Sequence, residues 1–376
     1  MNRLLGFRGW SLLVAPLAVV APLPLAAQFT LRDFVVSAGA SAEGYQGNFP
    51  AISVPITDST EVVSAFTGEL ALRTEADVQT ATNGAFFFTF DGGVRQFATT
   101  GFEQADYSPR EWVGTLDLGY ARGIGTGGSI AVQTRLRGRE IQDRPPMPLY
   151  LQPGYRSGEA SITASFPGPG EVLYDFRVAA SKSDFLAPAF APQIRLLDRE
   201  ALLVEAGALI TSGPSTLRLF AGVEGSRYPQ QNTFAPEDPF RRDRTYQGGV
   251  TWTRQTSSLL QLALDVRANR SNSLRPEYDA FTFSGLFATS LPRDLSLSVY
   301  GAISTKSYLH PSEFARLLPG EEADNATLAY VAVSRALSSR LDGTVRVGWT
   351  RAETDVGDAY FERFGGSFIV RFRPEF

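Results

Sequence analysis

The sequence contains no cysteine and a single histidine, His310. The absence of cysteine excludes disulfide scaffolds, thiolate metal sites and cysteine nucleophiles, and a lone histidine excludes every motif that needs two. Charged residues make up only 20% of the 376 residues and the formal net charge is -4, a balance that does not favour nucleic-acid binding. These absences predict a protein with no metal, no cofactor and no nucleic-acid partner.

Large apolar side chains are abundant, yet they never form a long run after residue 27. Aromatic residues make up 12% of the chain, including 27 Phe beside 35 Gly, while the mean hydropathy is only -0.08. No later apolar stretch is long enough to form a membrane-spanning helix. The arrangement of these side chains along the chain must therefore carry the information about the fold.

The first 27 residues have the layout of a secretory signal peptide. Arg3 and Arg8 precede an uncharged apolar stretch at 10–25, and small residues end the segment just before Gln28. A transmembrane anchor is the alternative, but three prolines in the apolar stretch each remove a helical hydrogen bond. We expect residues 1–27 to be cleaved and residues 28–376 to form a single exported domain.

Apolar and polar residues alternate with a period of two through most of that domain. Between residues 61 and 78, Val62, Phe66 and Leu70 share one parity, whereas Glu69 and Arg73 share the other. Successive side chains of a strand point to opposite faces, so each such segment has one apolar and one charged face. The same alternation recurs at 111–120, 130–139, 260–267 and 344–350. At 324–336 two parities compete for the apolar face, and no segment after Leu31 indicates a helix.

The connections between the expected strands alternate between short and long. The short ones are rich in Gly, Pro, Ser or Asn, as hairpin turns require, and lie at 80–84, 123–128, 167–170, 211–215, 255–258, 290–294 and 338–343. The others lie at 47–60, 98–108, 142–154, 184–198, 228–242, 271–276, 308–323 and 354–358. Seven short and eight other connections predict 16 strands. The count falls to 14 if 271–276 and 354–358 are not true connections.

The expected strands suit a membrane better than water. The two-faced pattern persists for about 10 residues or more per strand, the length that a tilted strand needs to cross a bilayer. Backbone polar groups must all be paired in lipid, so such a sheet has to close on itself. We therefore predict an all-β fold, a closed antiparallel up-and-down transmembrane β-barrel, with apolar residues outside and polar residues inside.

The end of the chain supports this fold through a resemblance. In 367–376, Phe368, Val370, Phe372 and Phe376 share one parity and the chain ends in phenylalanine. With the signal peptide and the strand meander, this segment resembles a Gram-negative outer-membrane β-barrel protein of the general porin kind. The resemblance implies location in the outer membrane, contact with its lipid and lipopolysaccharide, and recognition of these four residues by the barrel-assembly machinery.

Sixteen strands are enough to leave an aqueous channel. The first strand is expected to begin near Arg32, which leaves no room for an N-terminal plug domain. Charged residues on the inner face would set the ion preference of such a channel. By parity, the expected pore-lining residues are Glu69, Arg73, Glu75, Asp77, Asp117, Arg135, Arg137, Arg139, Asp175, Arg177, Arg218, Glu224, Asp265, Arg267, Arg346, Arg371 and Arg373.

Arg135, Arg137 and Arg139 occupy one face of one expected strand and have two interpretations. They resemble the basic wall of porins, facing a loop at 142–154 that narrows the channel. Alternatively, they pair with acids on neighbouring strands and stiffen the wall.

The function expected from these features is passive diffusion of small polar or charged solutes. One alternative is a closed structural or adhesive barrel whose lumen is blocked. The other is an outer-membrane enzyme, which would need His310 as its base, because no other side chain titrates ordinarily near neutral pH. The sequence leaves the oligomeric state open.

Overall fold

The computed structural model describes residues 28–47, 63–80, 83–100, 110–142, 153–187, 192–233, 237, 239–273, 277–309, 326–353 and 360–374. The expected signal peptide lies outside these residues. The described strands are β1 (Gln28–Gly47), β2 (Val63–Thr80), β3 (Gly84–Thr100), β4 (Arg110–Ile124), β5 (Gly128–Gln142), β6 (Tyr155–Pro167), β7 (Val172–Phe185), β8 (Arg199–Ser212), β9 (Ser215–Asn232), β10 (Phe240–Gln255), β11 (Ser258–Ser271), β12 (Tyr278–Leu291), β13 (Leu295–Tyr308), β14 (Ala326–Ser338), β15 (Leu341–Glu353) and β16 (Tyr360–Phe372).

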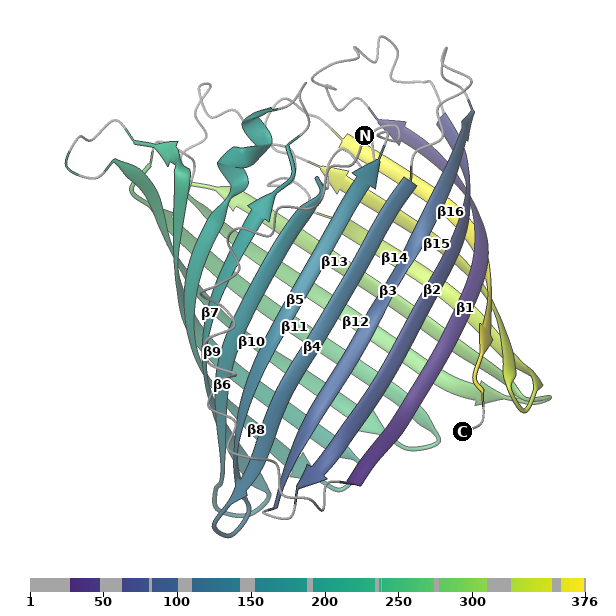
Figure 1. Cartoon of the computed structure of the whole chain (residues 1–376), viewed down its shortest axis with the longest axis horizontal. Helices are drawn as coiled ribbons and strands as arrows, with labels where there is room; N and C mark the ends of the chain where they lie inside the picture. Colours follow the sequence, from purple (N-terminus) through teal and green to yellow (C-terminus); the bar gives the residue numbers. More distant parts are fainter. Residues whose placement is uncertain are drawn as a thin grey trace.

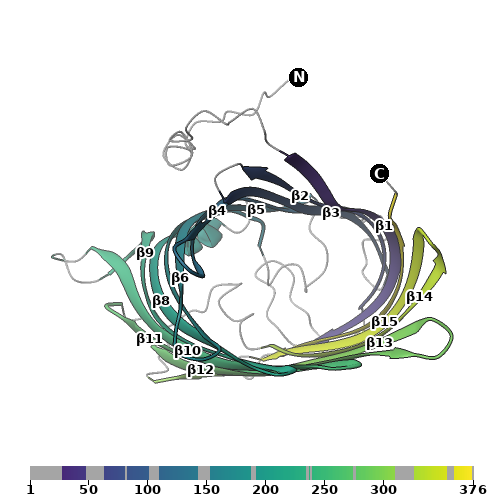
Figure 2. The same cartoon turned by 90° about the horizontal axis from the view of Figure 1, so that it is seen from below.

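These sixteen strands form one closed antiparallel barrel in which each strand pairs with its neighbours in sequence. The barrel closes between β1 and β16, which are antiparallel from Val36 opposite Phe372 to Gly47 opposite Phe361. Figures 1 and 2 show the tilted strands and their closed wall. The predicted closed meander of 16 strands is confirmed and the count of 14 is excluded. Closure leaves no unpaired sheet edge, as a lipid environment requires.

The short connections all lie at one end of the barrel, at the bottom of Figure 1. Three non-glycine residues in these turns have positive φ: Asn83 at 57°, Arg293 at 67° and Asp294 at 56°. Gly125 and Gly127 supply the same left-handed backbone in the β4–β5 turn. All seven short turns expected from the sequence are therefore real hairpins.

The two faces of the wall differ as the alternation predicts. Phe66, Leu202 and Phe368 lie on the outer face with exposed fractions of 58%, 54% and 50%. On the opposite parity, Asp77 and Glu111 are buried. Concave curvature crowds inner side chains together, so burial of charged groups marks the inner face. The near-zero mean hydropathy thus averages an apolar outer surface with a polar inner one.

The structure resolves the ambiguous segment at 324–336. Val331 and Val333 are exposed on the outer face of β14. Tyr330 pairs in register with Tyr300, and Leu328 with Ala302, so both share the parity of the inner face. The two parities competed in the sequence because this strand carries apolar residues on both faces.

Two details depart from the expectations. The strand β1 already begins at Gln28, before Arg32. A six-residue 3-10 helix, η3 (Pro192–Leu197), lies between β7 and β8 where no helix was predicted. It has only two turns at this length, too few to show a periodic pattern in sequence. No helix in the described part of the chain is long and apolar enough to span a membrane. Within the same ranges, no separate domain fills the barrel, in agreement with the predicted lack of a plug.

Candidate functional site

The candidate site is the inner face of the barrel wall. Each predicted pore-lining residue within a strand lies on the face opposite the exposed apolar side chains, and Arg373 follows β16 and pairs with the inner Asp342. Their placement on one face agrees with the sequence. Whether they line a conducting pore stays a prediction.

One ion-pair network crosses β2, β3, β4 and β5. The carboxylate of Glu69 lies 3.4 Å from Arg95, and the second carboxylate oxygen of Glu111 lies 3.5 Å from the same guanidinium. Arg139 completes the chain by donating to Glu111, and these two side chains are only 8% and 3% exposed. The network therefore ties four consecutive strands together through charged side chains.

Further pairs continue this pattern around the wall. Arg135 pairs with Asp117 on β4, and Arg177 pairs with Glu159 on β6. In register, Arg135 also lies opposite Glu159, so acid and base alternate across β4 to β7. Alternating charges of this kind keep the inner face polar while cancelling much of its local charge.

Arg218 on β9 contacts two acids at once. Its guanidinium lies 3.5 Å from Glu205 and 3.7 Å from Asp175. Gln247 on β10 donates to the other oxygen of Glu205 at 3.2 Å. Glu205 is buried, and its two partners, Arg218 and Gln247, compensate its charge.

A compact buried cluster lies on β9, β10 and β11 near the end with the long connections. Arg241 and Asp243 form an ion pair with exposed side-chain fractions of 6% and 3%. Asn269 donates to Asp243 at 3.3 Å, and Arg241 donates to Gln231 at 3.2 Å. The guanidinium also lies 4.2 Å from the ring centre of Tyr228. This cluster braces the mouth of the barrel on one side.

The remaining predicted residues make shorter-range contacts or lie beside each other. Arg73 pairs with Glu75, Asp77 with Arg32, and Glu224 with Arg199. Arg32 reaches Asp77 because a register shift between Leu31 and Asp33 displaces it from the regular ladder. Arg346 lies 5.8 Å from the ring centre of Tyr330, Arg371 donates to Thr344 at 3.4 Å, and Asp265 and Arg267 lie two residues apart on the inner face of β11.

The three arginines of β5 divide between the two interpretations. Arg135 and Arg139 pair with acids on β4, which supports the stiffening role for these two. Arg137 is exposed and lies opposite Thr115 and Ser157, two small neutral side chains. Only Arg137 therefore retains the position expected of a basic wall. The narrowing loop expected at 142–154 falls largely outside the described residues.

The wall formed by β12, β13 and β14 has a different chemistry. Tyr300 and Tyr330 stack with ring centres 5.3 Å apart, and Tyr278 and Tyr308 meet edge to face at 6.1 Å. The ammonium of Lys306 lies 4.2 Å from the ring centre of Tyr278. The described lumen thus has a charged side and a side of aromatic rings and hydroxyls.

The 3-10 helix η3 packs over the mouth on the side of β7 and β9. Ile194 and Leu197 are buried, with Phe185 packed against them. Gln231 of β9 donates to the carbonyl of Leu196, and Asp198 accepts a 2.7 Å hydrogen bond from the amide of Phe185. Burial raises the pKa of the Asp198 carboxyl above its ordinary value, and this hydrogen bond opposes the shift only in part.

Sequence reasoning missed the tyrosine pairs and many of the acids. Glu111, Glu159 and Glu205 have the inner parity but were not among the predicted residues. Tyrosine on a membrane barrel is expected in an outer girdle, which hid the inner ones. The signal was present in β13, where Tyr300 alternates in step with Ser298 and Ser304.

Catalytic and metal chemistry gain no support from the described residues. Among them no group of three or more His, Asp or Glu side chains could hold a metal ion. His310, the base that an enzyme would need, lies outside the described residues, so the enzyme alternative stays open.

Three of the four residues expected to form the assembly signal lie on one face of β16. Phe368 and Phe372 are exposed on the outer face of β16, and Val370 shares that face between them. Pro374 follows the end of the strand at Phe372 and therefore takes no place in the ladder. Phe376 lies outside the described residues.

No family model matches the chain, and no curated protein matches it. Solved structures with a similar fold include the anion-selective porin of Comamonas acidovorans, at 10% identity and a TM-score of 0.47, covering 93% of this chain and all of that one. OccK2 of Pseudomonas aeruginosa in complex with glucuronate is 12% identical with a TM-score of 0.43, and the match covers 92% of this chain and 99% of that one. A loop-deletion mutant of OmpT, an outer membrane protein of Vibrio cholerae, is 12% identical with a TM-score of 0.42, and the match covers 92% of this chain and 99% of that one. These scores carry no argument about function.

Proposed function

We propose that the protein is an outer-membrane passive diffusion pore for small polar or charged solutes. One observation carries this proposal, namely a closed sixteen-strand barrel with apolar side chains outside and ion-paired side chains inside. The outer face suits lipid and the inner face suits water, and a closed barrel is one of the two structures that can span a membrane.

The size of the barrel supports an open lumen. A strand spacing of about 4.8 Å and a tilt of about 40° place the backbone about 16 Å from the axis for sixteen strands. Inward side chains of about 6 Å reach less than half of that radius, so they do not fill the centre. Water and small solutes are therefore the expected contents.

The inner surface supports weak, unselective passage more than tight binding. Most described charges belong to ion pairs, which leaves local fields of both signs along the wall. The tyrosine side offers ring faces and hydroxyl groups to polar solutes. Conduction requires binding weak enough for release, which this mixture favours.

Single-channel recording in planar bilayers tests the proposal. Purified folded protein should give discrete conductance steps, and a salt gradient should give a reversal potential that reports its ion preference. Folding is verified separately by heat-modifiable migration in a gel. Repeated absence of steps from folded protein would overturn the pore and leave the closed structural or adhesive barrel as the better account.

The enzyme alternative is tested on His310. If the barrel were a hydrolase, His310→Ala would abolish its activity while leaving the conductance unchanged. We expect no hydrolase activity in either protein. We also expect the barrel-assembly machinery to recognise the C-terminal segment of the chain, which comprises the end of β16 and the residues up to Phe376.

A further inference from the structure

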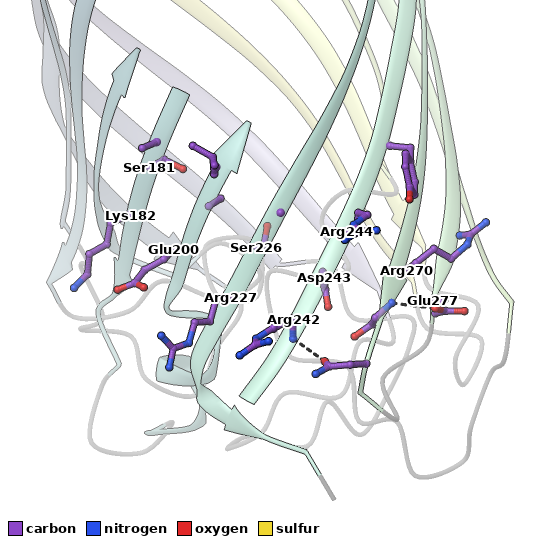
Figure 3. A pocket seen from close by; sticks show the side chains of 17 residues that line it. Ser181, Lys182, Glu200, Ser226, Arg227, Arg242, Asp243, Arg244, Arg270 and Glu277 are labelled. Carbon is purple, nitrogen blue, oxygen red and sulfur yellow. Dashed lines mark hydrogen bonds between the residues drawn. The ribbon is translucent and has the colours of Figure 1, made fainter. Parts of the chain in front are cut away.

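A basic depression lies on the outer surface of the barrel, at the end with the long connections. It encloses about 950 Å³ and is lined by residues of β7 to β11 and by Glu277 just before β12 (Figure 3). Five of its side chains are basic, and their register places all five on the outer face: Lys182, Arg227, Arg242, Arg244 and Arg270. This feature is separate from the lumen.

Two pairs of arginines face each other directly across neighbouring strands. Arg227 of β9 lies opposite Arg242 of β10, and Arg244 of β10 lies opposite Arg270 of β11. Like charges in directly opposed positions destabilise a sheet. Two adjacent pairs therefore concentrate positive charge on this part of the outer face.

Acidic residues lie at the edges of the patch. Arg270 pairs with Asp279 at 3.0 Å, and Lys182 lies 3.6 Å from Asp184. Glu200 is opposite both Lys182 and Arg227 in register. Acidic residues thus flank the patch on the β8 and β12 sides, and the two charged side chains that β10 directs to the outer face within it, Arg242 and Arg244, are both basic.

The patch lies directly beside an apolar surface. Tyr246 follows Arg244 on the outer face of β10 and is 46% exposed, and Leu202 on β8 is 54% exposed. Val223 and Val266 continue the exposed apolar surface on β9 and β11. An exposed tyrosine between basic and apolar side chains is typical of the boundary between headgroups and hydrocarbon. The depression therefore sits at headgroup depth.

We propose that this depression binds the phosphate groups of lipopolysaccharide in the outer leaflet. Arg242 and Arg244 hold the phosphates from β10, with Arg227 and Arg270 on either side, and the acyl chains lie along Leu202 and its apolar neighbours. Guanidinium groups bind phosphate through paired hydrogen bonds, and the phosphate relieves both like-charge pairs. The proposal rests on the outer-membrane location, since long connections face the cell exterior in such barrels.

Lipid binding to the folded, detergent-solubilised protein tests this proposal, with bisphosphorylated lipid A as the probe. Native mass spectrometry gives the affinity of the unaltered protein and of the double variant Arg242→Gln/Arg244→Gln. We expect the affinity of the variant for lipid A to be lower by a factor of about ten or more. The matched control is Arg156→Gln, which removes an outward arginine of β6 that pairs with Glu140 at 3.8 Å, and it should leave the affinity unchanged.

Two further arms identify the ligand. Lipid A stripped of its phosphates should bind the unaltered protein as weakly as intact lipid A binds the variant. Millimolar inorganic phosphate should not displace intact lipid A. Equal affinity for the variant, equal affinity for stripped lipid A, or displacement by inorganic phosphate would each overturn the proposal. If the double variant does not fold, Arg244→Gln alone replaces it, because it removes one like-charge pair and should fold at least as well.

The outcome is separable from that for the pore. The conductance of Arg242→Gln/Arg244→Gln should equal that of the unaltered protein, since both side chains face away from the lumen. If the unaltered protein conducts but binds intact and phosphate-stripped lipid A equally well, only the lipid site is overturned. Tight lipid binding by a protein that never conducts would overturn only the pore.

Discussion

Arg139 and Glu111 form an ion pair on the inner face of the barrel with side chains only 8% and 3% exposed. Arg156 and Glu140, on the outer face of the neighbouring β5–β6 pair, lie 3.8 Å apart with side chains 50% and 54% exposed. The two pairs have the same chemistry and differ in burial. They therefore allow a direct measurement of what the inner charges contribute to stability.

Replacing one partner of the buried pair should be costly. Glu111→Ala leaves the Arg139 guanidinium buried with its ion-pair partner removed, and we expect the free energy of unfolding to fall by about 3 kcal/mol. Glu140→Ala should lower it by less than about 1 kcal/mol, because this exposed pair lies at the ends of β5 and β6 beside a long connection, where water screens it. Urea titration of the folded protein in detergent measures both. Equal losses would show that burial of the inner pair has no energetic consequence.

A charged substitution on the outer face should destabilise the barrel more than one on the inner face. Phe283 is exposed on the outer face near the middle of β12, and Ser284 beside it faces inward. In lipid vesicles we expect Phe283→Arg to lower the unfolding free energy by about 2–4 kcal/mol and Ser284→Arg by less than about 1 kcal/mol. Reversible unfolding in vesicles compares them, and a larger loss for Ser284→Arg would reverse the assignment of the faces.

Arg137 should influence the ion preference of the channel. It is exposed on the inner face between two neutral neighbours, so reversing its charge changes the local field without breaking a described ion pair. We expect Arg137→Glu to shift the ratio of cation to anion permeability by about twofold towards cations. Arg254→Glu, on the outer face of β10, is the control. Reversal potentials under a salt gradient measure the permeability ratio of both variants. An identical shift for the control would show that the position of Arg137 in the lumen does not set the ion preference.

The segment around η3 should respond to pH through Asp198. Burial raises the pKa of this carboxyl, so the folded segment favours the protonated form. Its stabilising contribution is full below the ordinary value of about 3.9 and is lost as pH rises through the raised pKa. Hydrogen exchange of residues 185–187 and 192–198, corrected for intrinsic rates, should therefore be slower in acid than at neutral pH.

Asp198→Asn provides the matched test of that pH dependence. The amide oxygen of asparagine can still accept the hydrogen bond from the Phe185 amide, but it carries no charge. We expect slow exchange in this variant across the same pH range. Unchanged pH dependence in the variant would assign the effect to another group.

The terminal phenylalanine should matter for assembly in cells and little for the finished barrel. Deleting Phe376 should reduce the amount of folded protein in the outer membrane while spontaneous folding into detergent micelles stays unchanged. Phe364→Ala removes an exposed outer phenylalanine from β16 and serves as the control. A folding defect of equal size in micelles would assign a purely structural role to the end of the chain.

Much of this architecture could be predicted because strand alternation and turn chemistry are local. The period of two assigned Glu69, Arg73 and Asp117 to one face, and the Gly-rich turns located every hairpin. Alternation did not show which face of β14 points outward, because Leu328 and Tyr330 on one parity are as apolar as Val331 and Val333 on the other. Both pairs are apolar, and only the packing of β14 against β13 decided between them.

The sequence by itself assigned the predicted charged residues to one face and predicted sixteen strands, and the structure excluded the count of fourteen that the sequence had left open. Only the tertiary structure decided which charges meet, because cross-strand partners depend on the register between neighbouring strands, which the alternation within a single strand does not specify. That register brings Arg139 to Glu111, stacks Tyr300 on Tyr330, and sets Arg227 opposite Arg242 on the outer face. A shift of one residue in any pairing would reverse the faces and separate these partners, so the closed ladder selects them.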